Sequence, residues 1–590
     1  MAPPGVGLLT KALPHLALPS IITYGCLRAL ENVREVKLPI WMTVAIVVLV
    51  HPMLSIFRSF RDDWQMHSKA AANAAVVPPL LPSKLPLGLS HLSTVRNTVR
   101  SGVFARVLGV WAKELDATVY RVNLLGRIRF ITIEPDHVKT ILATQFEDFD
   151  KGPVVYDSFK SLLGSGVFNS DGDMWKFHRT MTRPFFNKDK ISHFDNFDRH
   201  ANDIIRLAKE RIAEGYPIDF QDMVARFTLD SATEYLFGYD VNSSGAGLPY
   251  PPGAPSSNPP EFFAHSSNRF VAAFGEGQNL TAMRVRVGPG WRLYEAWKDK
   301  VQPCRDVVDG FVNEILADSA LQKADIEAKK ATSETKPGDD DTLLSHLMKY
   351  TQDRRMLTDE IVNLLVAGRD TTSGTLSFGI YKLAEHPDIL AKLREEILDK
   401  VGATRRPTFE DIRDMKYLRA FLNEVLRLYP IVQANKDTLL PFKDASKPPV
   451  FIPSGTSVVY SVYLIHRRTD LWGPDAGTFD PDRFIDERLG KYLTRNPYIF
   501  IPFNAGPRIC LGQQFAYNEM SYFLIRLLQN FSGFSLADDV QPADTITSFP
   551  TSDAPGAEME KRVFAAHLTM YLKDSLWVRM TEAPAAEKNA

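Results

Sequence analysis

The stretch that decides the fold lies near the C-terminus and reads Phe503-Asn504-Ala505-Gly506-Pro507-Arg508-Ile509-Cys510-Leu511-Gly512. It follows the pattern F-x-x-G-x-R-x-C-x-G at every fixed position, and a chance match is expected about once in ten thousand segments or less often. Gly506 lets the loop turn, and Gly512 lets the backbone approach the sulfur of Cys510 closely. A helical segment follows directly, and its N-terminus favours a negatively charged sulfur. The pattern predicts a thiolate ligand; the alternative is a core cysteine in a glycine-rich loop.

The composition of the chain narrows the class of protein. The 590 residues are 45% hydrophobic, which is enough for a large core. The three cysteines, Cys26, Cys304 and Cys510, are widely spaced and odd in number, so they indicate neither a disulfide framework nor a zinc ribbon. The formal net charge is -1. Because such a chain has no electrostatic footprint for nucleic acid, we expect no nucleic-acid partner.

Residues 1–70 are predicted to form a membrane anchor region. Residues 38–57 contain no charged side chain, and a helix of about 20 residues spans the hydrocarbon core of a bilayer. A cleaved signal peptide and a buried core helix are the alternatives. Residues 12–27 are a poorer candidate for a second insertion or an interfacial segment. Residues 71–90 are rich in proline, which favours a stiff hinge, and residues 91–590 are predicted to form one catalytic domain.

A second motif lies on a long predicted helix and reads Ala367-Gly368-Arg369-Asp370-Thr371-Thr372. Ala367 and Thr371 are four residues apart and therefore share one face of the helix, with Asn363 one turn earlier. Gly368 permits a close approach or a local widening of the helix, which Thr371 can fill. The alternative interpretation is a polar patch on the surface of the helix.

Two further pairs of residues have helical spacing. Glu424 and Arg427 form an E-x-x-R pair, and Arg483 follows in the segment FDPDRF. Such pairs usually face solvent and contribute less than about 0.5 kcal/mol. Trp175 and Arg179 form a W-x-x-x-R pair, in which both side chains lie on one helical face.

These motifs, in the same order along the chain, resemble those of the cytochrome P450 superfamily, and the resemblance extends from Pro78 to the C-terminus. It implies the cytochrome P450 fold, mainly α with minor β (α+β), preceded by an N-terminal transmembrane helix. It also implies haem b as the cofactor, with Cys510 as the axial ligand of the iron. The other cofactor contacts that the resemblance implies involve Trp175, Arg179, Ala367, Gly368, Phe503, Gly506, Arg508 and Gly512.

The resemblance also assigns roles around the haem. Trp175, Arg179 and Arg508 would bind haem propionates, and Phe503 would shield the proximal face. The remaining roles fall to three groups of residues. Asp370 and Thr371 would relay protons to bound dioxygen, Glu424, Arg427 and Arg483 would form a buried structural triad, and Asn363, Ala367, Ile431 and Val432 would line the substrate pocket.

One position departs from the pattern of the family. After Tyr429-Pro430, the fungal enzymes of this type show P-x-N-x-R, whereas this chain has Asp437 where the arginine is expected. Lys436 is a neighbouring cation, but a point charge does not replace a bidentate guanidinium. We therefore expect no propionate contact from Asp437.

By resemblance, the chain is a monooxygenase that inserts one oxygen atom from O2 into an apolar substrate. Its motifs are similar to those of the fungal alkane and fatty-acid hydroxylase branch, whose relatives also accept terpenes and aromatics. The sequence contains no Gly-rich dinucleotide fingerprint, so the electrons of NADPH are expected from a separate NADPH–cytochrome P450 reductase, with cytochrome b5 as a further partner. The expected location is the endoplasmic reticulum membrane, with the catalytic domain in the cytoplasm.

Two other classes of protein remain open at this point. A haem-thiolate isomerase or dehydratase needs no reductase and often lacks the acid–alcohol pair, so Asp370 and Thr371 argue against it. A non-enzymatic haem sensor needs Cys510 but no proton relay.

Overall fold

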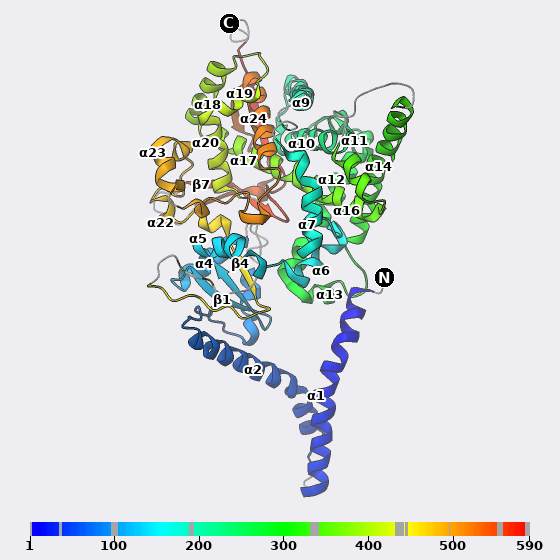
Figure 1. The fold of residues 1–590 in the computed structure, drawn as a ribbon, viewed down its shortest axis with the longest axis vertical. Helices are drawn as coiled ribbons and strands as arrows, with labels where there is room; N and C mark the ends of the chain where they lie inside the picture. Colours follow the sequence, from blue (N-terminus) through cyan, green and yellow to red (C-terminus); the bar gives the residue numbers. More distant parts are fainter. Residues whose placement is uncertain are drawn as a thin grey trace.

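The structure of the protein is a computed structural model, in which two N-terminal helices extend away from one end of a helical body (Figure 1). It describes residues 3–34, 38–95, 104–187, 191, 194–330, 342–430, 440, 442, 446–494, 496–550 and 558–584. Ile431, Val432 and Asp437, for which the sequence makes predictions, lie outside the described residues.

Helices make up most of the described chain. The N-terminal helices are α1 (Pro4–Arg34) and α2 (Ile40–Ala72). The central helix consists of α16 (Arg354–Leu365), the π-helical turn η8 (Val366–Asp370) and α17 (Thr371–Glu385). The other helices are α4 (Phe104–Glu114), α5 (Pro135–Lys139), α6 (Gly152–Leu163), α7 (Gly172–Thr182), α9 (Asp195–Ala213), α10 (Phe220–Phe237), α11 (Pro260–Ala264), α12 (Ser266–Val287), α13 (Trp291–Tyr294), α14 (Gln302–Lys330), α15 (Leu343–Tyr350), α18 (Pro387–Lys400), α19 (Phe409–Asp414), α20 (Lys416–Leu428), α21 (Val462–Ile465), α22 (Thr469–Trp472), α23 (Asp486–Leu489) and α24 (Gln513–Asn530).

The strands form small sheets at the edges of the helical body. They are β1 (Val119–Leu124), β2 (Arg127–Thr132), β3 (Ile218–Asp219), β4 (Ser457–Tyr460), β5 (Phe531–Leu536), β6 (Ile546–Pro550), β7 (Met559–Arg562), β8 (Phe564–Ala566), β9 (Met570–Leu572) and β10 (Trp577–Glu582). Two three-stranded sheets have the orders β1-β2-β4 and β3-β10-β5, and the pairs β6-β7 and β8-β9 form hairpin-like ribbons. The prediction of a mainly α fold with minor β is confirmed.

The central helix lies in the core, and residues 371–381 within it contain no charged side chain. Asp353 caps its N-terminus by accepting hydrogen bonds from the N–H groups of Arg355 and Met356. Residues 372–383 are all buried. Helices α20 and α24 pack against this segment within one large hydrophobic cluster, so the central helix connects most of the core.

The sheet β1-β2-β4 holds the proline-rich segment in place. In this sheet β1 pairs antiparallel with β2, and β2 pairs parallel with β4. Residues 71–90, predicted as a stiff hinge, run beside β1, where the N–H of Arg121 donates to the carbonyl of Pro79 and the N–H of Leu81 donates to Arg121. Proline lacks an N–H group, so such a segment is suited to the edge of a sheet. The segment is therefore bonded to the body rather than free.

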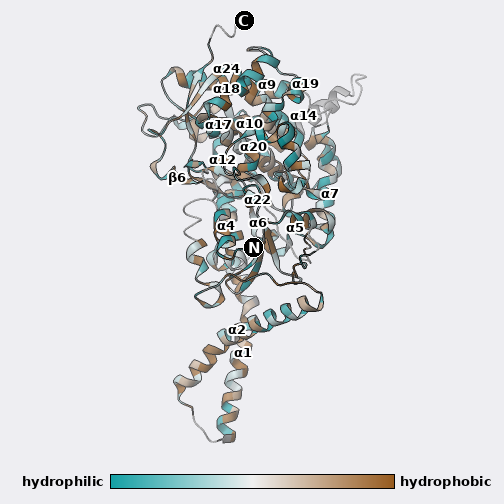
Figure 2. Ribbon diagram, turned by 90° about the vertical axis from the view of Figure 1, so that its left-hand side faces the viewer, coloured by the Kyte–Doolittle hydropathy of each residue, from teal (hydrophilic) through white to brown (hydrophobic). Residues whose placement is uncertain are grey.

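Both N-terminal helices are long and apolar enough to cross a membrane. The predicted span, residues 38–57, falls within α2, and residues 12–27 fall within α1. The apolar residues of the two helices are largely exposed in the structure (Figure 2). The helices contact each other, and the Oγ of Ser20 lies 2.8 Å from the Nε2 of His51. Two polar side chains that bond to each other lower the cost of placing both in lipid.

Candidate active site

The Cys510 loop has a backbone geometry that only its glycine pattern allows. Gly506 has a φ of 62°, in the left-handed region, and a Cβ at this position would lie 1.8 Å from the carbonyl oxygen of Leu142. The N–H of Cys510 donates to the carbonyl of Phe503 over 3.0 Å, which closes the loop. Both the left-handed φ and the approach of Leu142 therefore require glycine at position 506.

The thiol of Cys510 is surrounded by protein on most sides and exposed on one side. Its side chain is exposed, yet the protein around it raises the pKa of the thiol by burial. A hydrogen bond from the Gly512 N–H and the positive charge of Arg179 lower the pKa in part. A group that is surrounded by protein and still open on one side lies on the floor of a hollow. This arrangement fits a thiolate that binds a metal from that open side.

Three side chains predicted to face haem propionates lie together beside the loop. The guanidinium carbon of Arg508 lies 4.5 Å from the centre of the Trp175 ring, and that of Arg179 lies 5.7 Å from it. Arg179 also donates to the carbonyl of Ile509 over 2.8 Å. Arg508 forms an ion pair with Asp171 at 2.7 Å. The cluster contains two guanidinium groups and one aspartate, so it has a positive charge left for an anion.

Phe503 and Gly512 occupy the side of the loop that faces the core. The ring of Phe503 packs against Tyr517 of α24, with the ring centres 5.2 Å apart. A Cβ at Gly512 would lie 3.4 Å from the ring of Phe186, which is an ordinary contact. Gly512 is therefore less constrained by packing than Gly506, although its N–H bonds to Cys510.

The central helix widens at the second motif. In the π-turn η8, Thr371 donates from its Oγ1 to the carbonyl of Ala367 over 2.6 Å. This hydrogen bond uses the carbonyl that a regular helical turn would give to a backbone N–H. A Cβ at Gly368 would lie 3.0 Å from the Cβ of Ala232, so the close approach at Gly368 is to α10. The predicted contact between Gly368 and the cofactor stays a prediction.

A hollow borders the π-turn. Residues 357–383 of the central helix are buried, except for Ala367, Gly368, Arg369 and Thr371, which are partly exposed. Partial exposure in the middle of a core helix means that these residues border an internal space rather than the outer surface. The partly exposed π-turn, the uncovered Cys510 thiol and the cationic cluster are features that a flat cofactor with one thiolate ligand and carboxylate substituents requires.

The side chain of Asp370 is turned toward α12. Its Oδ1 accepts from Arg369 at 2.5 Å, and its Oδ2 accepts from the Nε2 of Gln278 at 2.6 Å. His567, in the turn between β8 and β9, lies close enough for Asp370 to raise its pKa, although burial lowers that pKa to about 4. Successive residues of a helix point in different directions. Among the described residues, Asp370 therefore bonds to Gln278 and Arg369 and not to the hydroxyl of Thr371.

Glu424, Arg427 and Arg483 meet in the core, where all three are fully buried. Arg427 donates twice to Glu424, at 2.7 Å for each bond. The Nε of Arg483 lies 3.7 Å from the Oε1 of Glu424. Arg427 also donates to the carbonyls of His466 and Ala476. These bonds satisfy Glu424 and Arg427, and all three side chains lie inside the core, where their role is structural.

The side chain of Asn363 is bonded to protein groups, and its predicted contact with substrate stays a prediction. Asn363 is fully buried, and its amide donates to the carbonyls of Leu163 and Asp359, while its Oδ1 accepts from the N–H of Phe168. The side chain therefore fixes the segment after α6 to the central helix. The helical spacing between Asn363 and Ala367 does not reveal that the segment after α6 packs against Asn363.

Glu519 is a buried acid that the sequence motifs do not single out. It lies on α24, nine positions after Cys510, and it hydrogen-bonds to the side chains of Ser231 and Thr372. Burial raises the pKa of Glu519 to about 8. The sequence motifs also do not point to Gln278 or Asp171. A sequence signal existed only for Glu519, as the one acid in the otherwise uncharged first three turns of its helix.

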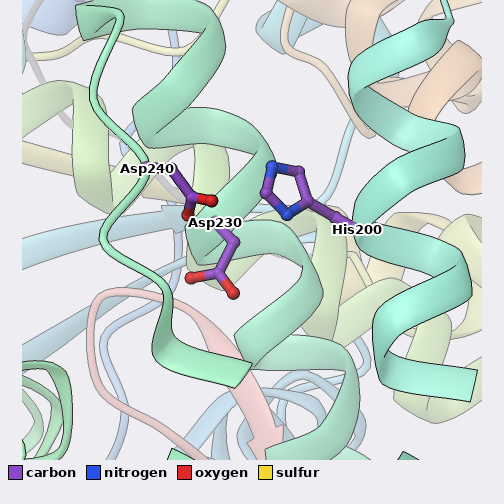
Figure 3. A group of neighbouring side chains, drawn as sticks. All are labelled: His200, Asp230 and Asp240. Atoms are coloured by element: carbon purple, nitrogen blue, oxygen red, sulfur yellow. The ribbon is translucent and has the colours of Figure 1, made fainter. Parts of the chain in front are cut away.

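Figure 3 shows a separate group, His200, Asp230 and Asp240, whose oxygen and nitrogen atoms lie within 4.8 Å of one another. His200 bonds to Glu234 at 2.7 Å, and both oxygens of Asp230 accept from backbone N–H groups of the segment that follows α10. These bonds connect α9, α10 and the following loop, so the group has a structural explanation.

Comparison with known proteins assigns the family. The family model described as cytochrome P450 matches residues 104–552. Cytochrome P450 52E1 of Candida apicola is 36% identical over 501 residues, which cover 82% of this chain and 90% of that protein. Cytochrome P450 52A5 of Candida maltosa is 38% identical over 478 residues, covering 78% and 81% of the two chains. Cytochrome P450 monooxygenase g430 of Fusarium sp is 36% identical over 510 residues, covering 83% and 85%. The chain therefore belongs to the cytochrome P450 family, and it is a cytochrome P450 monooxygenase similar to these fungal proteins.

Proposed function

We propose that Cys510 binds the iron of haem b and that the chain inserts one oxygen atom from O2 into an apolar substrate. The observation that carries this proposal is the Cys510 thiol, which is enclosed by protein yet exposed on one side. The Gly512 N–H and the charge of Arg179 favour the thiolate form that a metal requires. When bound, haem supplies the activation of dioxygen.

The cationic cluster beside the loop would hold the carboxylate groups of the cofactor. Arg179 and Arg508 supply guanidinium donors, and both lie beside the Trp175 ring, at 5.7 Å and 4.5 Å from its centre. Guanidinium groups bind carboxylates through two parallel hydrogen bonds. Because Arg508 also pairs with Asp171, a propionate would share this arginine with the aspartate.

The hydroxyl of Thr371 would hold the proton that the reaction consumes. It borders the hollow and already has a fixed acceptor, the carbonyl of Ala367. Asp370 is the nearest acid in the sequence, and it is connected through Gln278 and Arg369 to α12 and to the π-turn itself. Asp370 would return a proton to Thr371 after rotation or through water, as a general acid.

The partners follow from the same proposal. Electrons would come from NADPH through NADPH–cytochrome P450 reductase, with cytochrome b5 as a further donor. The docking surface would be the proximal face near Cys510, where exposed Lys176 can attract an acidic partner. Helices α1 and α2 would hold the protein in the lipid of the endoplasmic reticulum membrane, with the catalytic domain in the cytoplasm. Fatty acids and alkanes are the first substrates to test, followed by terpenes and aromatics.

The test combines a spectrum with a turnover assay. The reduced, CO-bound protein should show the red-shifted Soret band of thiolate-ligated haem, and the reductase should support NADPH consumption that depends on substrate. Cys510→Ser should abolish the shifted band, whereas Cys304→Ser on α14 should retain it. A shifted band without substrate-dependent turnover would favour a haem sensor. Product formation without a reductase would favour an isomerase or dehydratase.

A further inference from the structure

The start of α1 and the end of α2 both lie at the catalytic body, so the two helices form a hairpin (Figure 1). The start of α1 touches the body directly, because the N–H of Gly5 donates over 3.0 Å to the carbonyl of Ala296, which follows α13. Gly5 is buried there, and a Cβ at this position would lie 2.5 Å from the Cα of Ala296. The first turn of α1 is therefore seated on the catalytic body.

The end of α2 is bonded to the β1-β2-β4 sheet of the same body. Arg121 on β1 is buried, and it donates to the carboxylate of Asp63 on α2 over 2.6 Å and to the carbonyl of Pro78 over 2.8 Å. Met66, also on α2, packs into the hydrophobic cluster of this sheet. Both arms of the hairpin therefore leave the body on one side.

Ser20 and His51 mark one level at which the two helices meet. The Oγ of Ser20 lies 2.8 Å from the Nε2 of His51. From this contact toward the body, the first charged residue is Lys11 on α1 and Arg58 on α2. Because a helix rises about 1.5 Å per residue, these residues lie about 14 Å and about 11 Å from the contact. The uncharged part of the hairpin therefore ends at nearly one height on both helices.

The uncharged part also has the same thickness on both helices. Away from the body it ends at Arg28 on α1, and on α2 it extends to the start of the helix at Ile40. Its length is about 26 Å from Lys11 to Arg28 and about 27 Å from Ile40 to Arg58. The hydrocarbon core of an endoplasmic reticulum bilayer is about 27 Å thick. Both helices are thus matched to one bilayer.

The outer surface of this uncharged part is suited to lipid. Leu18 and Ile22 on α1 and Val44 and Val48 on α2 are exposed, and the hairpin is largely apolar over this length (Figure 2). Exposed apolar surface of such extent indicates contact with a membrane or a partner. The matched thickness favours the membrane, because a protein partner does not require it.

The end of the hairpin that lies away from the body carries charge. Arg28 forms an ion pair with Glu31 at 2.9 Å, and Arg34 is the last residue of α1. Charged side chains inside the hydrocarbon core are costly. This end therefore emerges on the far side of the bilayer rather than stopping within it.

We infer that α1 and α2 both cross the bilayer, so that the start of α1 and the catalytic body lie on the same side and residues 35–37 lie on the opposite side. A chain that crosses only once would place Gly5 and Ala296 on opposite sides of the bilayer, and the hydrogen bond between them could not form. The inference rests on the proposed membrane location and adds the number of crossings and the side of each end.

Protease protection in sealed microsomes, whose outer surface is cytoplasmic, tests this topology. The full-length chain is expressed in three versions, with one epitope tag placed before Met1, after Val36 or within residues 252–257, an exposed loop of the body. Without detergent, added protease should remove the first and third tags and leave the second intact. With detergent, all three tags should be lost. The third tag is the control for the orientation of the vesicles.

The outcomes separate the topology from the reaction. Protection of the tag before Met1 would overturn the hairpin, because the start of α1 would then lie on the far side. Loss of the tag after Val36 without detergent would overturn it as well, because the far end would not have crossed. The CO-bound spectrum of the same microsomes reports haem binding independently, so the hairpin can fail while the haem site stands.

Discussion

The Cys510 loop and the π-turn of the central helix both carry predicted site residues, but they are built in different ways. In the loop, the geometry depends mainly on bonds between near neighbours, such as the one from Cys510 to Phe503, and on the φ of Gly506, while the approach of Leu142 to Gly506 adds a long-range constraint. In the π-turn, the direction of Asp370 depends on Gln278, which is 92 residues away. A short motif can therefore describe the loop almost completely, whereas it describes only the composition of the π-turn.

The largest effect should come from breaking the loop at Gly506. In Gly506→Ala the new Cβ would meet the carbonyl of Leu142 at 1.8 Å, and the left-handed φ alone costs about 1–2 kcal/mol. We expect loss of the shifted CO band and of most bound haem, measured by absorbance per protein. Gly512→Ala is the matched control, because its Cβ would make an ordinary contact at 3.4 Å. Similar haem content in the two variants would contradict the claim that the backbone at Gly506 shapes the loop.

The next effect concerns the hydroxyl in the π-turn. Thr371→Ala removes the donor to the Ala367 carbonyl and the proton that we assign to it. We expect product per NADPH to fall about 10²-fold, at the lower end of the about 10²–10⁴-fold that a positioned acid contributes, while oxygen is still consumed and released as peroxide. Thr375→Ala, one turn later, removes a hydroxyl that donates to the Thr371 carbonyl, and this variant should keep its product yield. An unchanged yield in Thr371→Ala would refute the relay.

A smaller effect should follow from removing the hydrogen bond between Gln278 and Asp370. Gln278→Leu removes the amide that donates to Asp370 at 2.6 Å, so the acid would be held by Arg369 alone. We expect product formation to fall several-fold, with the CO spectrum unchanged, and the coupling of oxygen use to product to decrease. Asn279→Leu, the exposed neighbour on α12, serves as the control. Equal activities of the two variants would mean that the orientation of Asp370 has no role.

The smallest effect tests the residue that connects the two regions. Glu519 lies on the helix that begins at the loop, and it bonds to Thr372 beside the π-turn. Its carboxyl keeps a proton up to about pH 8 in the folded chain, against 4.5 for the ordinary group. Between these values the folded state binds more protons than the unfolded state, so this residue makes the free energy of unfolding fall as the pH rises.

Glu519→Gln should remove that slope. The variant and the parent should have nearly equal unfolding temperatures at pH 5, and the variant should be the more stable of the two at pH 8. Thermal unfolding followed by circular dichroism at both pH values provides the measurement. A variant that is less stable at pH 8 than at pH 5 by the same amount as the parent would show that Glu519 does not titrate in this range.

Much of the fold follows from local patterns. The strands around residues 118–133, the central helix and the helix after Cys510 all follow from periodicity and from motif spacing. The proline-rich segment 71–90 was different, because composition predicts stiffness but cannot reveal that β1 binds it. The bonds of Asn363 to Leu163 and Phe168 could not be predicted for a similar reason, since these partners lie about 200 residues earlier in the chain.

The sequence by itself determined the identity of the ligand residue, the glycine positions around it, the order of the motifs and the apolar N-terminal segments. These features depend on covalent neighbours, on backbone conformation and on hydrophobic length, all of which are local. Only the tertiary structure decided where Asp370 points and which acid is buried beside Thr372. Such features depend on which segments, distant in the sequence, meet in the core. The order of residues along one chain does not show which segments meet.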